Sequence, residues 1–263
     1  MNIVSNSARQ RPVYDHRPGD GPTLVFLHYW GGSARTWDPV VDCLPGRDVV
    51  TVDFRGWGRS RDLAGPYTLE QFADDVLGIV RAADVEDYVL LGHSMGGKVA
   101  QLAAARHPVG LRGIVLVAPG PAKPPATVTP QYQDQLAHAY DSEESIAAAR
   151  DTVLTATPLS EASKARVLAD SSSSADGARR EWPLHGIVQD ITEQTRAISV
   201  PALVIGGRND RVEPVEVLRD NLMPYLSDAT LAVIPNTGHL SPLEAPVELA
   251  DAVARFGPLA HRG

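Results

Sequence analysis

The chain has 263 residues and a mass of 28.2 kDa, which fits one globular domain with room for an inserted subdomain. Its net charge of −8 gives no general attraction for phosphate backbones, so we expect no nucleic-acid partner. The single cysteine, Cys43, excludes an intrachain disulfide and a cysteine-based zinc site. No apolar run approaches membrane-spanning length and residues 1–11 hold no apolar signal segment, so we expect a cytoplasmic protein without a membrane partner.

Six short apolar runs are typical of buried β-strands. They lie at residues 23–28, 48–53, 88–92, 113–118, 202–206 and 230–234. Each run is nearly continuous in apolar character, as strands covered on both faces of a parallel sheet are. Helical patterns lie between most of the runs, with the clearest starts and periods after Thr68, over 95–107, from 213 and over 246–256. This alternation predicts the α/β class, with a mostly parallel, doubly wound sheet.

Residues 119–195 interrupt the alternation, because they contain no strand-like run and begin with a proline-rich stretch. Within them Val128, Tyr132, Leu136 and Tyr140 recur every four residues, which is typical of one face of a helix. A long disordered linker is the alternative, but apolar stripes of this kind need a surface to pack against. We therefore predict a core of residues 1–118 and 196–263 with a helical subdomain, residues 119–195, inserted into it.

The pentapeptide Gly92-His93-Ser94-Met95-Gly96 lies directly after one predicted strand and directly before a predicted helix. The G-x-S-x-G pattern is typical of a sharp strand-to-helix turn that exposes a serine hydroxyl, with glycines where larger side chains would collide. Met95 begins the helix, so its N–H points toward any negative charge that forms at Ser94. A glycine-rich turn with an incidental serine is the alternative, but the flanking strand and helix favour a nucleophile.

A nucleophilic serine needs a base, and the base needs an orienting carboxylate. Among the eight histidines we select His239, because it follows the final strand-like run and a loop at that end displays its side chain. Asp210 follows the run at 202–206 and completes the order Ser, Asp, His along the chain. Asp53 also ends a strand and is the alternative acid, although its glycine-rich surroundings favour a structural turn.

Five segments together resemble the landmarks of a known family. They are the serine turn at 92–96, the D-x-R-G-x-G-x-S loop at 53–60, the acid turn at 206–210, the histidine segment at 236–242 and the loop at 27–32. On these the chain resembles the α/β-hydrolase fold family, especially its compact serine esterases and cofactor-free haloperoxidase-like members, over about residues 24–256. The resemblance implies that residues 119–195 form a helical cap above the site.

The resemblance also implies an oxyanion hole made by the backbone N–H groups of Trp30 and Met95. Tyr29 departs from the pattern, because the family usually has glycine there; we expect Gly31 and Gly32 to absorb the strain. His28, Tyr29 and Trp182 are candidate substrate-lining residues. Lys98, one helical turn after the serine, is expected on a solvated helix face.

These residues predict hydrolysis of a small carboxylic ester or lactone through an acyl-enzyme, with no metal and no organic cofactor. Haloperoxidase or perhydrolase activity, carbon–carbon bond hydrolysis and cofactor-free dioxygenation are alternatives that use similar machinery. A non-enzymatic small-molecule receptor is the alternative from another class. Epoxide or haloalkane hydrolysis is disfavoured, because that chemistry uses aspartate at the position of Ser94. The oligomeric state and the identities of the acyl and alcohol groups are not predicted.

Overall fold

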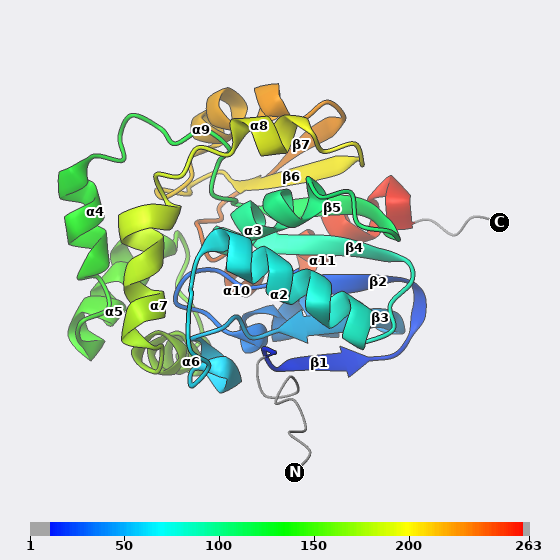
Figure 1. Cartoon of the computed structure of the whole chain (residues 1–263). Helices are drawn as coiled ribbons and strands as arrows, with labels where there is room; N and C mark the ends of the chain where they lie inside the picture. Colours follow the sequence, from blue (N-terminus) through cyan, green and yellow to red (C-terminus); the bar gives the residue numbers. More distant parts are fainter. Residues whose placement is uncertain (1–10, 260–263) are drawn as a thin grey trace, which may run out of the picture.

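The computed structural model describes residues 11–259, in which seven strands form one sheet in the order β1-β3-β2-β4-β5-β6-β7 (Figure 1). Only β1 runs antiparallel to its neighbour. The strands are β1 (Tyr14–Arg17), β2 (Asp20–Leu27), β3 (Arg47–Val52), β4 (Tyr88–His93), β5 (Leu111–Val117), β6 (Ala202–Gly207) and β7 (Ala229–Ile234). The outermost parts of the predicted core, residues 1–10 and 260–263, lie outside the described residues.

Helices cover both faces of this sheet, α2 and α3 on one and α1, α10 and α11 on the other (Figure 1). The helices are α1 (Asp38–Asp42), α2 (Leu69–Ala82), α3 (Met95–Ala104), α4 (Pro130–Ala137), α5 (Glu143–Ala149), α6 (Glu161–Ser172), α7 (Asp176–Glu181), α8 (Thr192–Arg196), α9 (Val215–Asn221), α10 (Ser241–Glu244) and α11 (Pro246–Ala254). Successive residues of β2 enter opposite cores, Leu24 and Phe26 on one face and Val25 and Leu27 on the other. The continuous apolar runs are therefore explained by burial on both faces.

All six predicted strands are present, and the predicted α/β class is confirmed. Strand β1 was not predicted. Its sequence, Tyr14-Asp15-His16-Arg17, is short and polar, and it pairs only with β3 at the edge of the sheet. A largely exposed edge strand needs no apolar run, so no hydrophobic signal marks it.

The chain between β5 and β6 is helical and lies at one end of the sheet, where α4 to α7 stand together at the left of Figure 1. This arrangement does not fit a disordered linker. Tyr140, Ile146 and Trp182 from this inserted segment, residues 119–195, join the same buried cluster as the residues beneath α2 and α3. Because that cluster is shared, the division of the chain into two domains stays a prediction.

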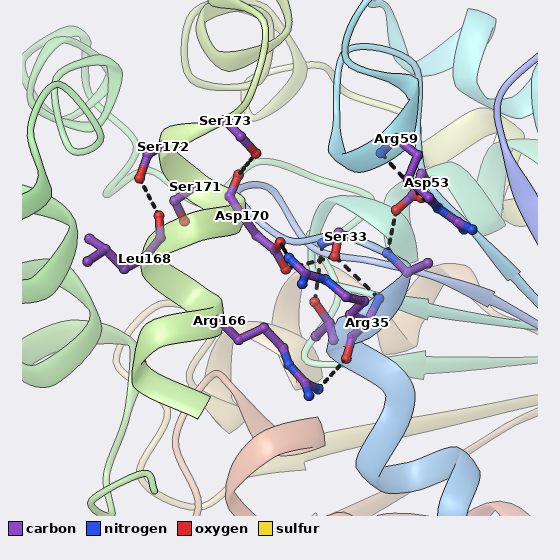
Figure 2. Close-up of polar contacts among 12 residues, drawn as sticks. Ser33, Arg35, Asp53, Arg59, Arg166, Leu168, Asp170, Ser171, Ser172 and Ser173 are labelled. Atoms are coloured by element: carbon purple, nitrogen blue, oxygen red, sulfur yellow. Dashed lines mark hydrogen bonds and ion pairs between the residues drawn. The ribbon is translucent and has the colours of Figure 1, made fainter. Parts of the chain in front are cut away.

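Helix α6 fastens the inserted segment to the loop that follows β2. Figure 2 shows Asp170, on α6, facing Ser33 and Arg35. The buried Asp170 carboxylate accepts a hydrogen bond from Ser33 Oγ at 2.7 Å and pairs with the Arg35 guanidinium. One turn earlier, Arg166 donates to the carbonyl of Arg35 at 2.9 Å. Side chains from the inserted segment thus hold this loop at Ser33 and Arg35.

Loss of the Asp170 carboxylate tests this attachment. We expect Asp170→Ala to lower the free energy of unfolding by about 1–3 kcal/mol, because a buried hydroxyl donor and a guanidinium lose their acceptor. Limited proteolysis within residues 119–195 becomes faster in the same variant. Urea unfolding and a protease time course measure both effects. Glu161→Ala, which removes an exposed carboxylate of the same helix, is the matched control and leaves both unchanged.

Candidate active site

Ser94 lies between β4 and α3 in a backbone conformation that side-chain-bearing residues rarely adopt, with φ of 54° and ψ of −117°. The flanking glycines make this turn possible. A Cβ at Gly92 would lie 2.3 Å from the carbonyl oxygen of Gly96, and a Cβ at Gly96 would lie 2.5 Å from that of Leu27. Gly92 therefore lets the first turn of α3 lie close to β4, and Gly96 lets it lie close to the end of β2. Both contacts place the serine at the edge of the sheet.

The structure brings Ser94, His239 and Asp210 together from the ends of β4, β7 and β6. His239 Nε2 lies 2.9 Å from Ser94 Oγ, and His239 Nδ1 lies 2.9 Å from Asp210 Oδ2. The other oxygen, Asp210 Oδ1, accepts from the N–H groups of Val212 and Glu213 at 2.8 and 3.0 Å. All three side chains are almost completely buried.

The charge on Asp210 follows from these contacts. Burial acts to raise the pKa of Asp210, but the neighbouring imidazole and the two amide donors outweigh it and hold the pKa below its ordinary value. The carboxylate is therefore ionised at neutral pH and accepts a hydrogen bond from His239 Nδ1. That tautomer leaves Nε2 without a proton, so it accepts from the Ser94 hydroxyl.

Asp53, the alternative acid, is engaged elsewhere. Its Oδ1 accepts from the N–H of Ala34 at 2.7 Å, and its Oδ2 accepts from Arg59 Nε at 2.6 Å (Figure 2). Asp53 therefore braces the loop after β2 against the loop after β3. The structure places Asp210, and not Asp53, beside the imidazole of His239.

The loop after β2 accommodates the side chain of Tyr29 because Gly31 and Gly32 follow it closely in the chain. Gly31 has a φ of +94°, and a Cβ there would lie 2.4 Å from the ring of Tyr140. A Cβ at Gly32 would lie 2.6 Å from the ring of Tyr29 itself. The two glycines thus make room for two aromatic rings, and of the two only Gly31 has a positive φ.

Side chains of the inserted segment hold the carbonyl groups of this loop. The Tyr140 hydroxyl donates to the carbonyl of Trp30 at 3.3 Å, and Ser171 Oγ donates to that of Gly31 at 2.9 Å. The Trp30 and Tyr140 rings also stack, with centroids 4.1 Å apart and planes 18° apart. These bonds fix the two peptides that follow Trp30.

The N–H of Trp30 shares its peptide plane with the carbonyl of Tyr29, which accepts from His28 Nδ1 at 2.7 Å and from the N–H of Gly32 at 3.1 Å. The Trp30 N–H itself donates to no acceptor within residues 11–259. The N–H of Met95, in the first turn of α3, has no acceptor within its helix.

A cavity of about 200 Å³ lies in front of Ser94, between the sheet and the inserted segment. Its wall is mainly apolar and includes Tyr29 and Trp182, both expected there. His28 does not reach this cavity. Its Nδ1 donates to the carbonyl of Tyr29 at 2.7 Å and its Nε2 accepts from the N–H of Phe54 at 3.0 Å, so both ring nitrogens support the backbone beneath the site. The expectation that His28 lines the substrate cavity is wrong for this reason.

Lys98 is also placed differently from the expectation. It is fully buried rather than solvated, and its Nζ donates to the carbonyl of Gly186 at 3.1 Å above the ring of Trp182. Burial lowers the pKa of Lys98 to about 8. The amine therefore ties α3 to the inserted segment behind the cavity wall. A lysine within an alanine-rich helix gives no signal of such a partner in the sequence.

Two residues that position His239 were not singled out from the sequence. His93 Nε2 donates to the carbonyl of His239 at 2.7 Å, and the two rings lie 5.2 Å apart. The Glu244 carboxylate accepts from the N–H of Gly238 at 3.1 Å and from those of Ala156 and Thr157 at 2.8 and 2.9 Å. Glu244 thereby joins the histidine loop to the inserted segment. Glu244 is the last residue of α10, and no sequence motif there would reveal this role.

Neither a metal site nor a membrane helix is evident within residues 11–259. No three His, Cys, Asp or Glu side chains gather there in a way suited to hold a metal ion. No helix in the same range is both long and apolar enough to cross a bilayer.

Comparisons with known proteins agree with the fold. The model of the alpha/beta hydrolase fold family matches residues 22–246. The pimeloyl-(acyl-carrier protein) methyl ester esterase of Nitrosomonas europaea is 29% identical over 254 residues, covering 89% of this chain and 95% of that one. The non-heme haloperoxidase of Rhodococcus erythropolis is 25% identical, with 84% and 86% covered. The solved esterase of Exiguobacterium antarcticum has the same fold, with a TM-score of 0.83 at 20% identity and 92% and 93% covered.

The buried imidazole of His93 predicts a pH dependence of stability. Burial lowers its pKa to about 3, whereas a histidine in the unfolded chain titrates near ~6.5. Between these values only the unfolded state binds the proton, so stability falls as the pH falls from 6.5 toward 3. One such proton contributes a slope of about 1.4 kcal/mol per pH unit. Urea unfolding between pH 6 and 4 measures the slope, which we expect to be smaller by this amount in His93→Gln. Equal slopes in variant and wild type would contradict the assignment.

Proposed function

The chain belongs to the alpha/beta hydrolase fold family and is a hydrolase, and from this premise we propose that it cleaves a small carboxylic ester or lactone through an acyl-enzyme formed on Ser94. The observation that carries the proposal is the continuous contact from Ser94 Oγ through His239 to Asp210, with both distances at 2.9 Å. The curated relative named as a methyl ester esterase supports the same bond type.

In the first step Ser94 Oγ attacks the carbonyl carbon of the ester while its proton passes to His239 Nε2. Asp210 holds the imidazole in the tautomer that accepts this proton and stabilises the imidazolium that forms. Two backbone donors fix Asp210 in turn, so this carboxylate does not have to reorganise during the reaction.

The negative oxygen of the tetrahedral intermediate is held by the N–H groups of Trp30 and Met95. One such donor typically contributes ~2.7–4 kcal/mol of transition-state stabilisation. The N–H of Met95 also lies at the positive end of α3, which favours negative charge at Ser94.

The intermediate then collapses and the alcohol leaves with the proton from His239. Water, activated by the same imidazole, attacks the acyl group and releases the carboxylic acid and free Ser94. The chemistry as written needs no redox step. The cavity of about 200 Å³ lies below the ~300–1,000 Å³ of drug-sized sites, which supports a short acyl or alkyl group in it.

Peroxide in place of water during deacylation would yield a peracid from the same acyl-enzyme. The curated relative named as a non-heme haloperoxidase makes this the second candidate activity. Both activities share the first step. An assay with acetate, peroxide and a halide distinguishes peracid formation from simple hydrolysis, because hydrolysis gives no halogenated product.

Replacement of the nucleophile tests the shared first step. We expect Ser94→Ala to lower kcat for short p-nitrophenyl esters by at least about a thousandfold, because no acyl-enzyme can form. A burst of nitrophenol from the wild-type protein, absent in the variant, measures acylation directly. Full activity in Ser94→Ala would refute the assignment. A single turnover followed by tight retention of the product would favour a receptor instead.

The hold of Tyr140 on Trp30 gives a second test. We expect Tyr140→Phe to lower kcat about three- to tenfold with little change in KM, because the stacked ring remains while the carbonyl of Trp30, in the peptide next to the one that carries the oxyanion donor, loses one hydrogen bond. Steady-state kinetics on p-nitrophenyl acetate measure the split. Tyr88→Phe, which removes a buried hydroxyl at the far end of β4, is the matched control and keeps wild-type kcat. An unchanged kcat in Tyr140→Phe would show that the loop does not need this bond.

A further inference from the structure

Glu213 is the buried acidic group of the site that the proposed mechanism does not use. Its N–H donates to Asp210 Oδ1, so its backbone is fixed three residues after the acid. Its side chain is buried, with 5% exposure for the residue, and lines the cavity that also contains Ser94 and His239. Any ligand placed at Ser94 therefore lies in the same enclosed space as this carboxyl.

The Glu213 carboxyl has no hydrogen-bonding partner within residues 11–259, and its Oε2 is fully buried. Lys98 is the cation that acts on it, but the Lys98 amine donates to Gly186 and forms no ion pair with Glu213 among the described residues. A buried carboxyl without a partner destabilises the folded chain. Its presence in the wall of the cavity therefore calls for a ligand that pairs with it.

The surroundings favour the uncharged form of this carboxyl. Burial, together with the negative charge of Asp210, raises the pKa of Glu213 well above its ordinary value, and Lys98 opposes this only in part. An uncharged carboxyl offers one O–H donor and one carbonyl acceptor. Much of the cavity wall is apolar and includes Leu136, Leu154, Trp182 and Val212.

We propose that Glu213 determines specificity by hydrogen bonding to one uncharged polar group, a hydroxyl or an oxo group, on an otherwise apolar ester. This inference rests on the proposed function, because it assumes that the ester carbonyl lies at Ser94. An all-apolar ester leaves the carboxyl unpaired in the cavity, whereas a hydroxylated one satisfies it. An ester with an ammonium group is disfavoured, because it would require a second buried carboxylate charge beside Asp210.

The test compares pairs of short esters that differ only by a hydroxyl in place of one hydrogen, along the acyl chain or the alcohol. For the wild type we expect kcat/KM to favour the hydroxylated member about tenfold at the best position. Glu213→Met abolishes or reverses this ratio, whereas Glu213→Gln, which keeps a donor and an acceptor, retains most of it. Glu216→Met, which removes a largely exposed carboxylate outside the cavity wall, is the matched control and keeps the wild-type ratio.

Binding separates this inference from the proposed function. Calorimetry with the Ser94→Ala variant and the matching amides, which resist cleavage, measures the same preference as a ratio of Kd values. If no ester is turned over but the amide ratio depends on Glu213, the proposed function fails and the specificity role stands. An unchanged ratio in Glu213→Met, no preference for a hydroxyl at any position, or a preference for an ammonium-bearing ester would each overturn the proposal. Should Glu213→Met not fold, the wild-type ratios alone decide it.

Discussion

The contact between Ser94 Oγ and His239 Nε2 joins residues that lie 145 positions apart, and the rest of the site is arranged around it. Ser94 follows β4 and His239 follows β7, with β5 and β6 between them in the sheet. No single element can set this distance. It depends on the glycine-permitted approach of α3 to β2 on one side and on the loop at 236–240 on the other. His93 and Glu244 hold that loop through its carbonyl and N–H groups, so its place is set by buried hydrogen bonds rather than by packing alone.

The inserted segment does more than cover the cavity, because its side chains also hold the loop after β2. Tyr140 and Ser171 hold the carbonyls of the loop after β2, and Asp170 fastens its next turn. The peptide groups of this loop are therefore oriented by residues more than a hundred positions later in the chain. A movement of the inserted segment would therefore act directly on the carbonyls of Trp30 and Gly31. Tyr140 is thus both part of the cavity wall and a partner of this loop.

What could be predicted from the sequence follows from the periodicity of a parallel sheet. Strands buried on both faces give continuous apolar runs, and their carboxyl ends share one edge, so the meeting of Ser94, Asp210 and His239 was predictable. The roles of side chains that act through partners distant in the chain could not be predicted. The polar edge strand β1, the buried amine of Lys98 and the backbone contacts of His28 depend on which surfaces meet in three dimensions. Nothing in the residues next to them signals those partners.

The turn between β4 and α3 concentrates features that oppose folding. Ser94 has a positive φ, His93 is an uncharged buried imidazole whose Nδ1 has no partner among the described residues, and Lys98 is a buried amine. Each of these raises the free energy of the folded chain, by about 1–3 kcal/mol for the backbone conformation alone. The same helix offsets them, because Val99, Ala100, Leu102 and Ala103 are almost completely buried against the sheet and α2. Helix α3 can therefore hold its first turn in an unfavourable conformation because its later turns anchor it, and this rigidity keeps the serine hydroxyl within reach of the imidazole.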